Sequence, residues 1–193
     1  VANTINNMKE IPKIKYIITL DSDTNLILNS AFELIGTMEH ILNKPILKDG
    51  VVIEGHGIIQ PKVGIDLKEA EKSWFSRIFA GSAGTDLYTN AISDFYQDNF
   101  GEGIFTGKGI YELNTFYNVM KNAIPEYTVL SHDLLEGSYL RCGLATDVLL
   151  MDGYPSKFMS FTTRQNRWIR GDWQICNWLC KNIRNEKNER IRN

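Results

Sequence analysis

The chain has 193 residues, a size that suits one domain or a large part of one. Hydrophobic residues make up 43% and charged residues 23% of it, which excludes a disordered tail and a fibrous rod. The formal net charge of −2 provides no overall field for binding nucleic acid. No apolar run approaches the roughly 18 residues that a bilayer-spanning helix needs.

The first half of the chain predicts a strand, a helix and a second strand. The apolar run 16–20 stops at an acidic residue and suits a strand buried on both faces, as in a parallel sheet. Ser30 and Glu33 have the spacing of a capping box that opens a helix, and Pro45 closes that region. A β-rich run over 51–59 is expected to end at the Gln-Pro pair that follows it.

The second half adds loops, helices and one more strand. Residues 64–109 are rich in glycine and aromatic residues, a composition typical of a ligand cleft or of a buried loop core. A short helix is expected after Asn114, another over about 132–142, a strand over 146–151, and a long helix from about 160 to 180. This alternation of strands and helices predicts an α/β architecture.

The chain has three cysteines, Cys142, Cys176 and Cys180, too few for a disulfide framework. Cys176 and Cys180 would share a helix face, as a metal pair can, but further ligands at metal spacing are missing. The sequence therefore favours ordinary core thiols in a reducing compartment.

Two carboxylates, Asp21 and Asp23, follow the first predicted strand. In open α/β sheets ligands bind at the carboxyl ends of the strands, and paired carboxylates can hold a divalent cation that neutralises phosphate oxygens. Haloacid-dehalogenase-type phosphatases place a similar pair there, with Thr or Val two residues after the second Asp. Here Asn25 occupies that position and Thr24 comes one place too early, which disfavours a phosphatase.

A glycine-rich loop, Gly103-Ile-Phe-Thr-Gly107-Lys108-Gly109, has some features of a nucleotide-binding P-loop. The spacing between its glycines is wrong, and Gly109 replaces the Ser or Thr that would hold the metal. An ATP-binding P-loop is excluded, while a backbone cradle for a sugar or a phosphate, with Lys108 as its charge, stays open.

Two further motifs carry charged and aromatic groups. In Ser131-His132-Asp133 the order argues against a hydrolase triad, and Asp133 is either a charge at a helix start or a general base. On the last helix, Arg164 and Arg167 share a stripe with Trp178; arginines bind phosphate and tryptophan stacks on sugars, although an ion-paired surface is the alternative.

Taken in order, these motifs resemble the processive inverting glycosyltransferases of the cellulose-synthase type. The closer resemblance is to the glycosyltransferase domain of the cyclic β-1,2-glucan synthases. It is carried by five stretches that span most of the chain, 18–24, 55–63, 94–111, 130–137 and 164–174.

The resemblance implies a partial Rossmann-like domain of the GT-A type with a mixed, mostly parallel sheet and flanking helices, its N-terminal nucleotide-binding half largely missing. It implies UDP-glucose as donor, a β-glucan acceptor and Mg²⁺ or Mn²⁺. By this resemblance, Asp21 and Asp23 bind the metal and the donor diphosphate, and Asp133 is the base. Arg167 and Trp168 lie at the diphosphate and acceptor end of the site. The loop beneath the acceptor sugar contains Phe105, Gly107, Lys108 and Gly109. The family motif is Gln-x-x-Arg-Trp, and here Arg164 stands in the place of that glutamine.

The resulting prediction is a catalytic fragment over 1–180 of a longer protein, followed by a charged segment over 181–193. That segment is either a solvated helix end or a basic stretch leading to membrane spans outside this chain. A synthase that uses a cytosolic donor and exports its product would sit on the cytoplasmic face of the bacterial inner membrane. A sugar-binding module without turnover is the other alternative.

Overall fold

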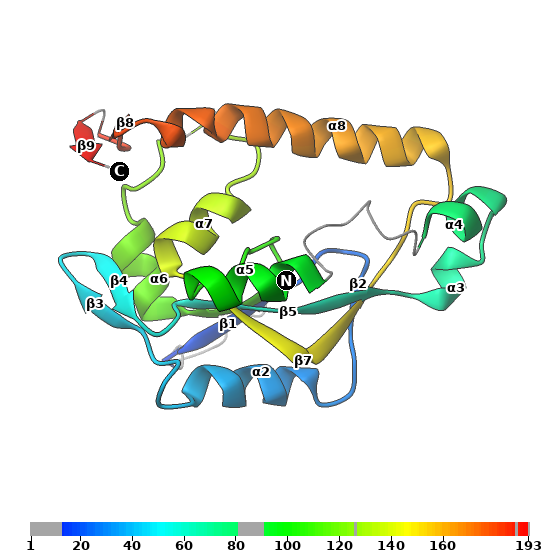
Figure 1. The fold of residues 1–193 in the computed structure, drawn as a ribbon, viewed down its shortest axis with the longest axis horizontal. Helices are drawn as coiled ribbons and strands as arrows, with labels where there is room; N and C mark the ends of the chain where they lie inside the picture. Colours follow the sequence, from blue (N-terminus) through cyan, green and yellow to red (C-terminus); the bar gives the residue numbers. More distant parts are fainter. Residues whose placement is uncertain (1–12, 81–90, 126, 188, 193) are drawn as a thin grey trace, which may run out of the picture.

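The computed structural model describes residues 13–80, 91–125, 127–187 and 189–192. A five-stranded sheet forms the centre, with helix α2 (Ser30–Glu39) on one face and helices α6 (Leu113–Met120) and α7 (Asp133–Leu140) on the other (Figure 1). The strand order is β1 (Tyr16–Thr19), β6 (Gly109–Glu112), β5 (Ile58–Ile65), β7 (Gly143–Asp152) and β2 (Thr24–Leu26). The predicted α/β class is confirmed.

The pairing of the strands is less parallel than the sequence predicts. Among the described strands of this sheet only β5 and β7 pair in parallel, and the other three pairings are antiparallel. Strand β1 lies at an edge, and Ile17 keeps 39% of its surface exposed. The prediction of a strand buried on both faces was wrong because an apolar run alone does not tell a central strand from an edge strand.

Two hydrophobic clusters pack on the two faces of the sheet. Ile59 and Ile110 join Leu34 and Met38 of α2, whereas neighbouring residues such as Ile58 join the cluster under α6 and α7. Successive residues of a strand point to opposite faces, so each strand contributes to both clusters. The two-sided core holds the strand ends in fixed positions, and these ends carry the candidate site.

Two predicted element boundaries in the first half of the chain were wrong. Ser30 is not a cap: it lies inside α2 and its hydroxyl donates to the Leu149 carbonyl (2.9 Å), while Asn29 with φ 72° precedes the helix. Strand β5 does not end at Pro61 but continues to Ile65. It shifts its register on β7 directly after Pro61, a position at which a strand tolerates proline.

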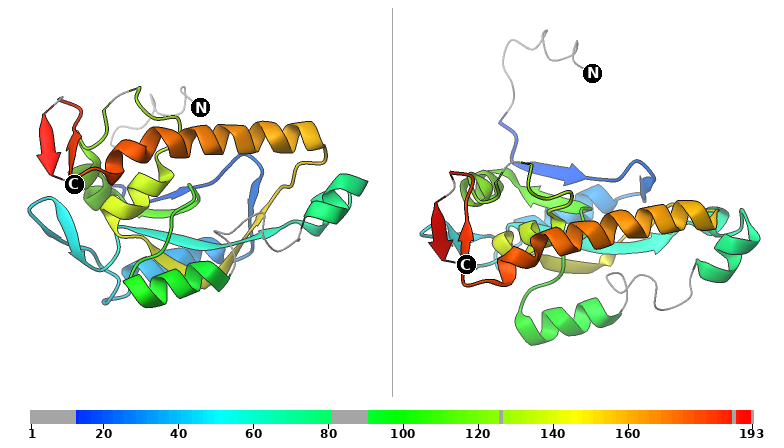
Figure 2. Two further views of the ribbon diagram at one scale, coloured as in Figure 1. Left: turned by 45° about the horizontal axis from the view of Figure 1, so that its top comes forward. Right: turned by 90° about the horizontal axis from the view of Figure 1, so that it is seen from above.

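The remaining elements surround this centre. They are β3 (Ile46–Lys48), β4 (Val51–Glu54), α3 (Leu67–Ala70), α4 (Trp74–Phe79), α5 (Ala91–Phe100), α8 (Phe158–Gln174), a 3-10 segment η2 (Ile175–Leu179), β8 (Asn182–Arg184) and β9 (Arg190–Arg192). Helix α8 lies across the far side of α6 and α7 from the sheet, as Figures 1 and 2 show. The long helix ends at Gln174 rather than near residue 180.

The end of the chain and the cysteines differ from expectation. The charged segment is not a solvated helix end, because β8 and β9 pair as a hairpin and Ile183 is buried. Cys142 is a core thiol as predicted, but Cys176 and Cys180 are exposed. No helix in the described part of the chain has the length and apolar character to cross a membrane.

Candidate active site

The candidate site lies at one edge of the sheet, where several chain segments meet for a topological reason. Strands β1, β5 and β7 run in the same direction, since β6 is antiparallel to both β1 and β5. The carboxyl ends of β1 and β7 therefore lie at the same edge of the sheet as the amino end of β6. Asp21, Asp152 and Lys108 occupy these three positions.

The acidic turn after β1 is exposed. The Thr24 amide donates to the Asp21 carbonyl (3.1 Å), and the Gly153 amide donates to the Asp23 carbonyl (3.1 Å). A β-carbon on Gly153 would lie 3.2 Å from Asp23 Oδ2, so the two backbones approach closely. The turn thus holds two carboxylates beside the loop that follows β7, at the edge where the sequence predicts a ligand.

Lys108 joins this turn to Asp152, the last residue of β7. Its Nζ atom lies 3.1 Å from Asp21 Oδ2 and 2.9 Å from Asp152 Oδ2. Burial alone would lower the pKa of Lys108, but the hydrogen bonds and charges of Asp152 and Asp21 outweigh it and raise this pKa. Lys108 is therefore a buried, charged ammonium held between two carboxylates.

Asp152 was not among the residues predicted from the sequence. A signal was available, because Asp152 follows the predicted strand 146–151 just as Asp21 follows 16–20. An acidic residue at the end of a second strand with the same direction marks the same edge of a sheet.

Asp133 opens helix α7 and stands beside the same loop. Its Oδ2 atom accepts from the Ser131 hydroxyl (2.9 Å) and lies 3.1 Å from the position that a β-carbon on Gly107 would take. Burial raises the pKa of Asp133, and the charges of Glu136 and Asp21 act in the same direction. Asp133 therefore lies beside Gly107, and Asp21 lies beside the next residue, Lys108.

The acceptor loop predicted from the resemblance is held tightly by its neighbours. Gly107 has φ 90°, a conformation that glycine adopts without strain, and the Thr19 hydroxyl donates to its carbonyl (3.2 Å). A β-carbon on Gly109 would lie 2.2 Å from the Ile59 carbonyl oxygen. Phe105 is completely buried and packs edge-to-face on Tyr111, so it supports the loop from the core and exposes no surface to a sugar.

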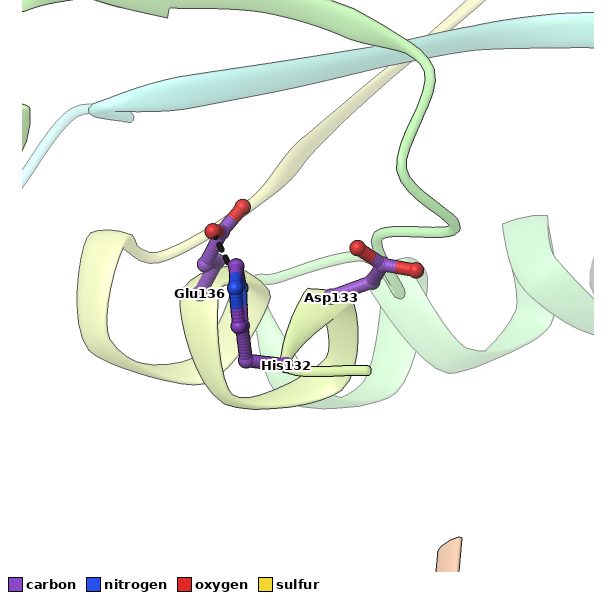
Figure 3. Close-up of side chains that lie close together, drawn as sticks. All are labelled: His132, Asp133 and Glu136. Carbon is purple, nitrogen blue, oxygen red and sulfur yellow. Dashed lines mark ion pairs between the residues drawn. The ribbon is translucent and has the colours of Figure 1, made fainter. Parts of the chain in front are cut away.

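A second polar group lies next to Asp133 at the start of α7. Glu136 is 4% exposed, with one oxygen 2.6 Å from His132 Nδ1 and the other accepting from the Tyr111 hydroxyl (2.6 Å). The hydrogen bond with Glu136 raises the pKa of His132. His132, Asp133 and Glu136 are close enough to share a metal ion, but both oxygens of Glu136 have protein partners, and Figure 3 shows the Asp133 carboxylate apart from the pair.

Helix α8 approaches the site from the side opposite the sheet. Gln174 Oε1 accepts from the Leu130 amide (2.7 Å), and Gly171 faces Ser131, so the helix is attached to the segment that carries Asp133. The guanidinium of Arg164 lies over two rings, 4.9 Å from the centre of Trp168 and 5.6 Å from that of Tyr154.

The predicted roles of Arg167 and Trp168 are not tested by these contacts. Trp168 is partly buried beneath Arg164, whereas Arg167 is exposed. Among the ion pairs of the described residues none links Arg167 to an acid of the site.

Comparison with known proteins agrees with the resemblance. No protein-family model matches the chain. The cyclic β-(1,2)-glucan synthase NdvB of Rhizobium meliloti (strain 1021) is 43% identical over 169 residues, which cover 86% of this chain and 6% of that protein. The chain therefore spans a small part of the relative's length. The resemblance seen in the motifs is confirmed: the chain is related to a segment of the cyclic β-(1,2)-glucan synthases.

Proposed function

We propose that this chain is part of a glucosyltransferase that transfers glucose from UDP-glucose to a growing β-1,2-glucan, with inversion at the anomeric carbon. One observation carries the proposal: a partly buried carboxylate and an exposed acidic turn meet at the Gly107–Lys108 loop. The relationship to a cyclic β-(1,2)-glucan synthase supports the glucan as product.

Inverting transfer requires a base that takes the proton from the acceptor hydroxyl as that oxygen attacks the sugar. Asp133 suits this role because burial raises its pKa and so makes its carboxylate a better proton acceptor. The Ser131 hydroxyl fixes one of its oxygens. The second oxygen would receive the proton.

The leaving diphosphate requires positive charge on the opposite side of the reacting carbon. Asp21 and Asp23 provide exposed carboxylate oxygens on one turn, a donor set that fits Mg²⁺ or Mn²⁺ completed by phosphate oxygens. Such an ion would neutralise the charge that develops on the diphosphate. Lys108 adds a fixed positive charge beside Asp21, and we assign Arg167 and Trp168 to the same end of the donor.

The acceptor sugar would rest on the loop that contains Gly107, Lys108 and Gly109, with the ring of Trp168 nearby and Phe105 supporting the loop from the core. A glycine at 107 keeps the space beside Asp133 free of a side chain, as an incoming hydroxyl needs. The whole protein would act at the cytoplasmic face of the inner membrane through segments outside this chain.

The test is Asp133→Asn in the full-length protein that contains this chain, with UDP-glucose and a β-1,2-glucan primer. UDP release should fall about 10²- to 10⁴-fold, the usual loss when a positioned base is removed. Asp147→Asn serves as the control, because Asp147 is an exposed carboxylate on β7. Binding of UDP should stay unchanged in both variants.

Three results would contradict the proposal. Near-normal turnover in Asp133→Asn would reduce Asp133 to a charge at a helix start. Release of phosphate from simple phosphoesters would instead identify a phosphatase. Binding of glucan without any release of UDP by the wild-type protein would identify a sugar-binding module.

A further inference from the structure

Asp152 connects two segments that the proposed function treats separately. Its Oδ1 atom accepts from the hydroxyl of Thr24, which ends the acidic turn, and its Oδ2 atom lies 2.9 Å from Lys108 Nζ in the glycine-rich loop. The side chain of Asp152 is 18% exposed and that of Lys108 is 10% exposed, whereas Asp21 is 59% exposed. The buried pair thus lies behind the exposed carboxylate that would bind a cation.

The charges at this edge are unevenly shared. Asp21, Asp23 and Asp152 contribute three negative charges and Lys108 one positive charge, so the group carries a net charge of −2. The single ammonium is divided between Asp21 and Asp152, and the shorter of its two contacts is the one to Asp152. Without Asp152, the whole charge of Lys108 would act on Asp21.

We propose that Asp152 is a positioning residue of the donor site: it shares the Lys108 ammonium with Asp21 and offsets part of its charge, so that Asp21 and Asp23 keep enough negative charge to bind a divalent cation. The inference rests on the proposed function, since it assumes that this turn binds the cation. Lys108 then limits how tightly the cation binds in the absence of the diphosphate, because two positive charges beside one carboxylate repel each other. When donor arrives, its phosphates add negative charge that both cations can share.

A purely structural contact between Lys108 and Asp152 would behave differently. Removing either side chain would then disorder the acidic turn, and both substitutions would weaken cation binding. A charge-setting pair requires opposite effects, because one substitution removes a negative charge and the other removes a positive charge.

The experiment measures binding of Mn²⁺ alone to the full-length protein, without nucleotide, from the electron paramagnetic resonance signal of the free ion. Asp152→Asn keeps an oxygen for Thr24 but removes the charge, and should weaken Mn²⁺ binding about tenfold. Lys108→Met should strengthen it about tenfold. The double variant removes one charge of each sign and should return to within about threefold of the wild type. Lys62→Met, at an exposed lysine of β5, is the matched control and should change nothing.

Shifts in the same direction for both single variants, or no shift in either, would overturn the inference. So would Mn²⁺ binding that survives Asp23→Ala, because the ion would then bind elsewhere. If Lys108→Met fails to fold because Asp152 loses its partner, Asp152→Asn and the double variant still decide the question. Opposite shifts in a protein that never releases UDP would refute the proposed function and leave this inference standing.

Discussion

Replacing Gly107 by alanine tests how closely the loop and the base depend on each other. Gly107 has φ 90°, and an added β-carbon would lie 3.1 Å from Oδ2 and 3.2 Å from Cγ of Asp133. Both distances are shorter than ordinary carbon contacts, so either the loop or the Asp133 carboxylate must move by a few tenths of an ångström. The substitution therefore strains the backbone and displaces the proposed base at the same time.

The two effects have different sizes and different readouts. A side chain at a strained φ costs about 1–3 kcal/mol of folding stability. A misplacement of about 1 Å at a reacting group costs roughly 10²-fold in rate, so a few tenths of an ångström should cost about three- to tenfold in turnover. Stability is followed by thermal unfolding, and turnover by UDP release, both in the full-length protein.

Gly50→Ala is the matched control. Gly50 lies in the turn between β3 and β4 with φ 79°, and an added β-carbon would have no neighbouring atom within 4 Å. It should lose stability as Gly107→Ala does, but turnover should stay within about twofold of the wild type, because surface changes away from a site rarely affect it. Equal turnover in the two variants would refute the contact between Gly107 and the base.

Two further predictions concern helix α7. Because the pKa of Asp133 is raised and a base acts in its deprotonated form, kcat/KM should fall on acidification at a higher pH than for an ordinary aspartate; a profile that stays flat down to about pH 4 would contradict this. The hydrogen bond with Glu136 and then the charge of Glu136 raise the pKa of His132, and this pair stabilises α7 until the pH rises through that pKa; Glu136→Gln should abolish this pH-dependent loss of stability. Hydrogen exchange of the α7 amides at pH 6 and 8.5 measures this, and an unchanged pH dependence would show that the pair contributes nothing.

Local sequence determines much of this protein. The apolar run 16–20, the helical spacing after residue 30 and the amphipathic pattern of α8 each describe one element and need no knowledge of the rest. The positions of Asp21 and Asp133 are local in the same sense, since one follows a strand and the other opens a helix. For this reason the candidate residues could be named in advance, and a family resemblance could be read from their order.

The tertiary structure decides which of these residues meet. Thr24 and Asp152 are 128 residues apart in the sequence, and they meet because β2 pairs antiparallel with β7 in a register that places Thr24 opposite Asp152. Serine is a common helix cap, yet the Ser30 hydroxyl donates to the Leu149 carbonyl. No local sequence pattern reveals this partner. The alternating pattern of a strand shows which side chains face the core, but it does not show which strand is its neighbour or in which direction that neighbour runs. The ammonium of Lys108 between two carboxylates is thus a product of the fold, while the acids themselves are visible in the chain.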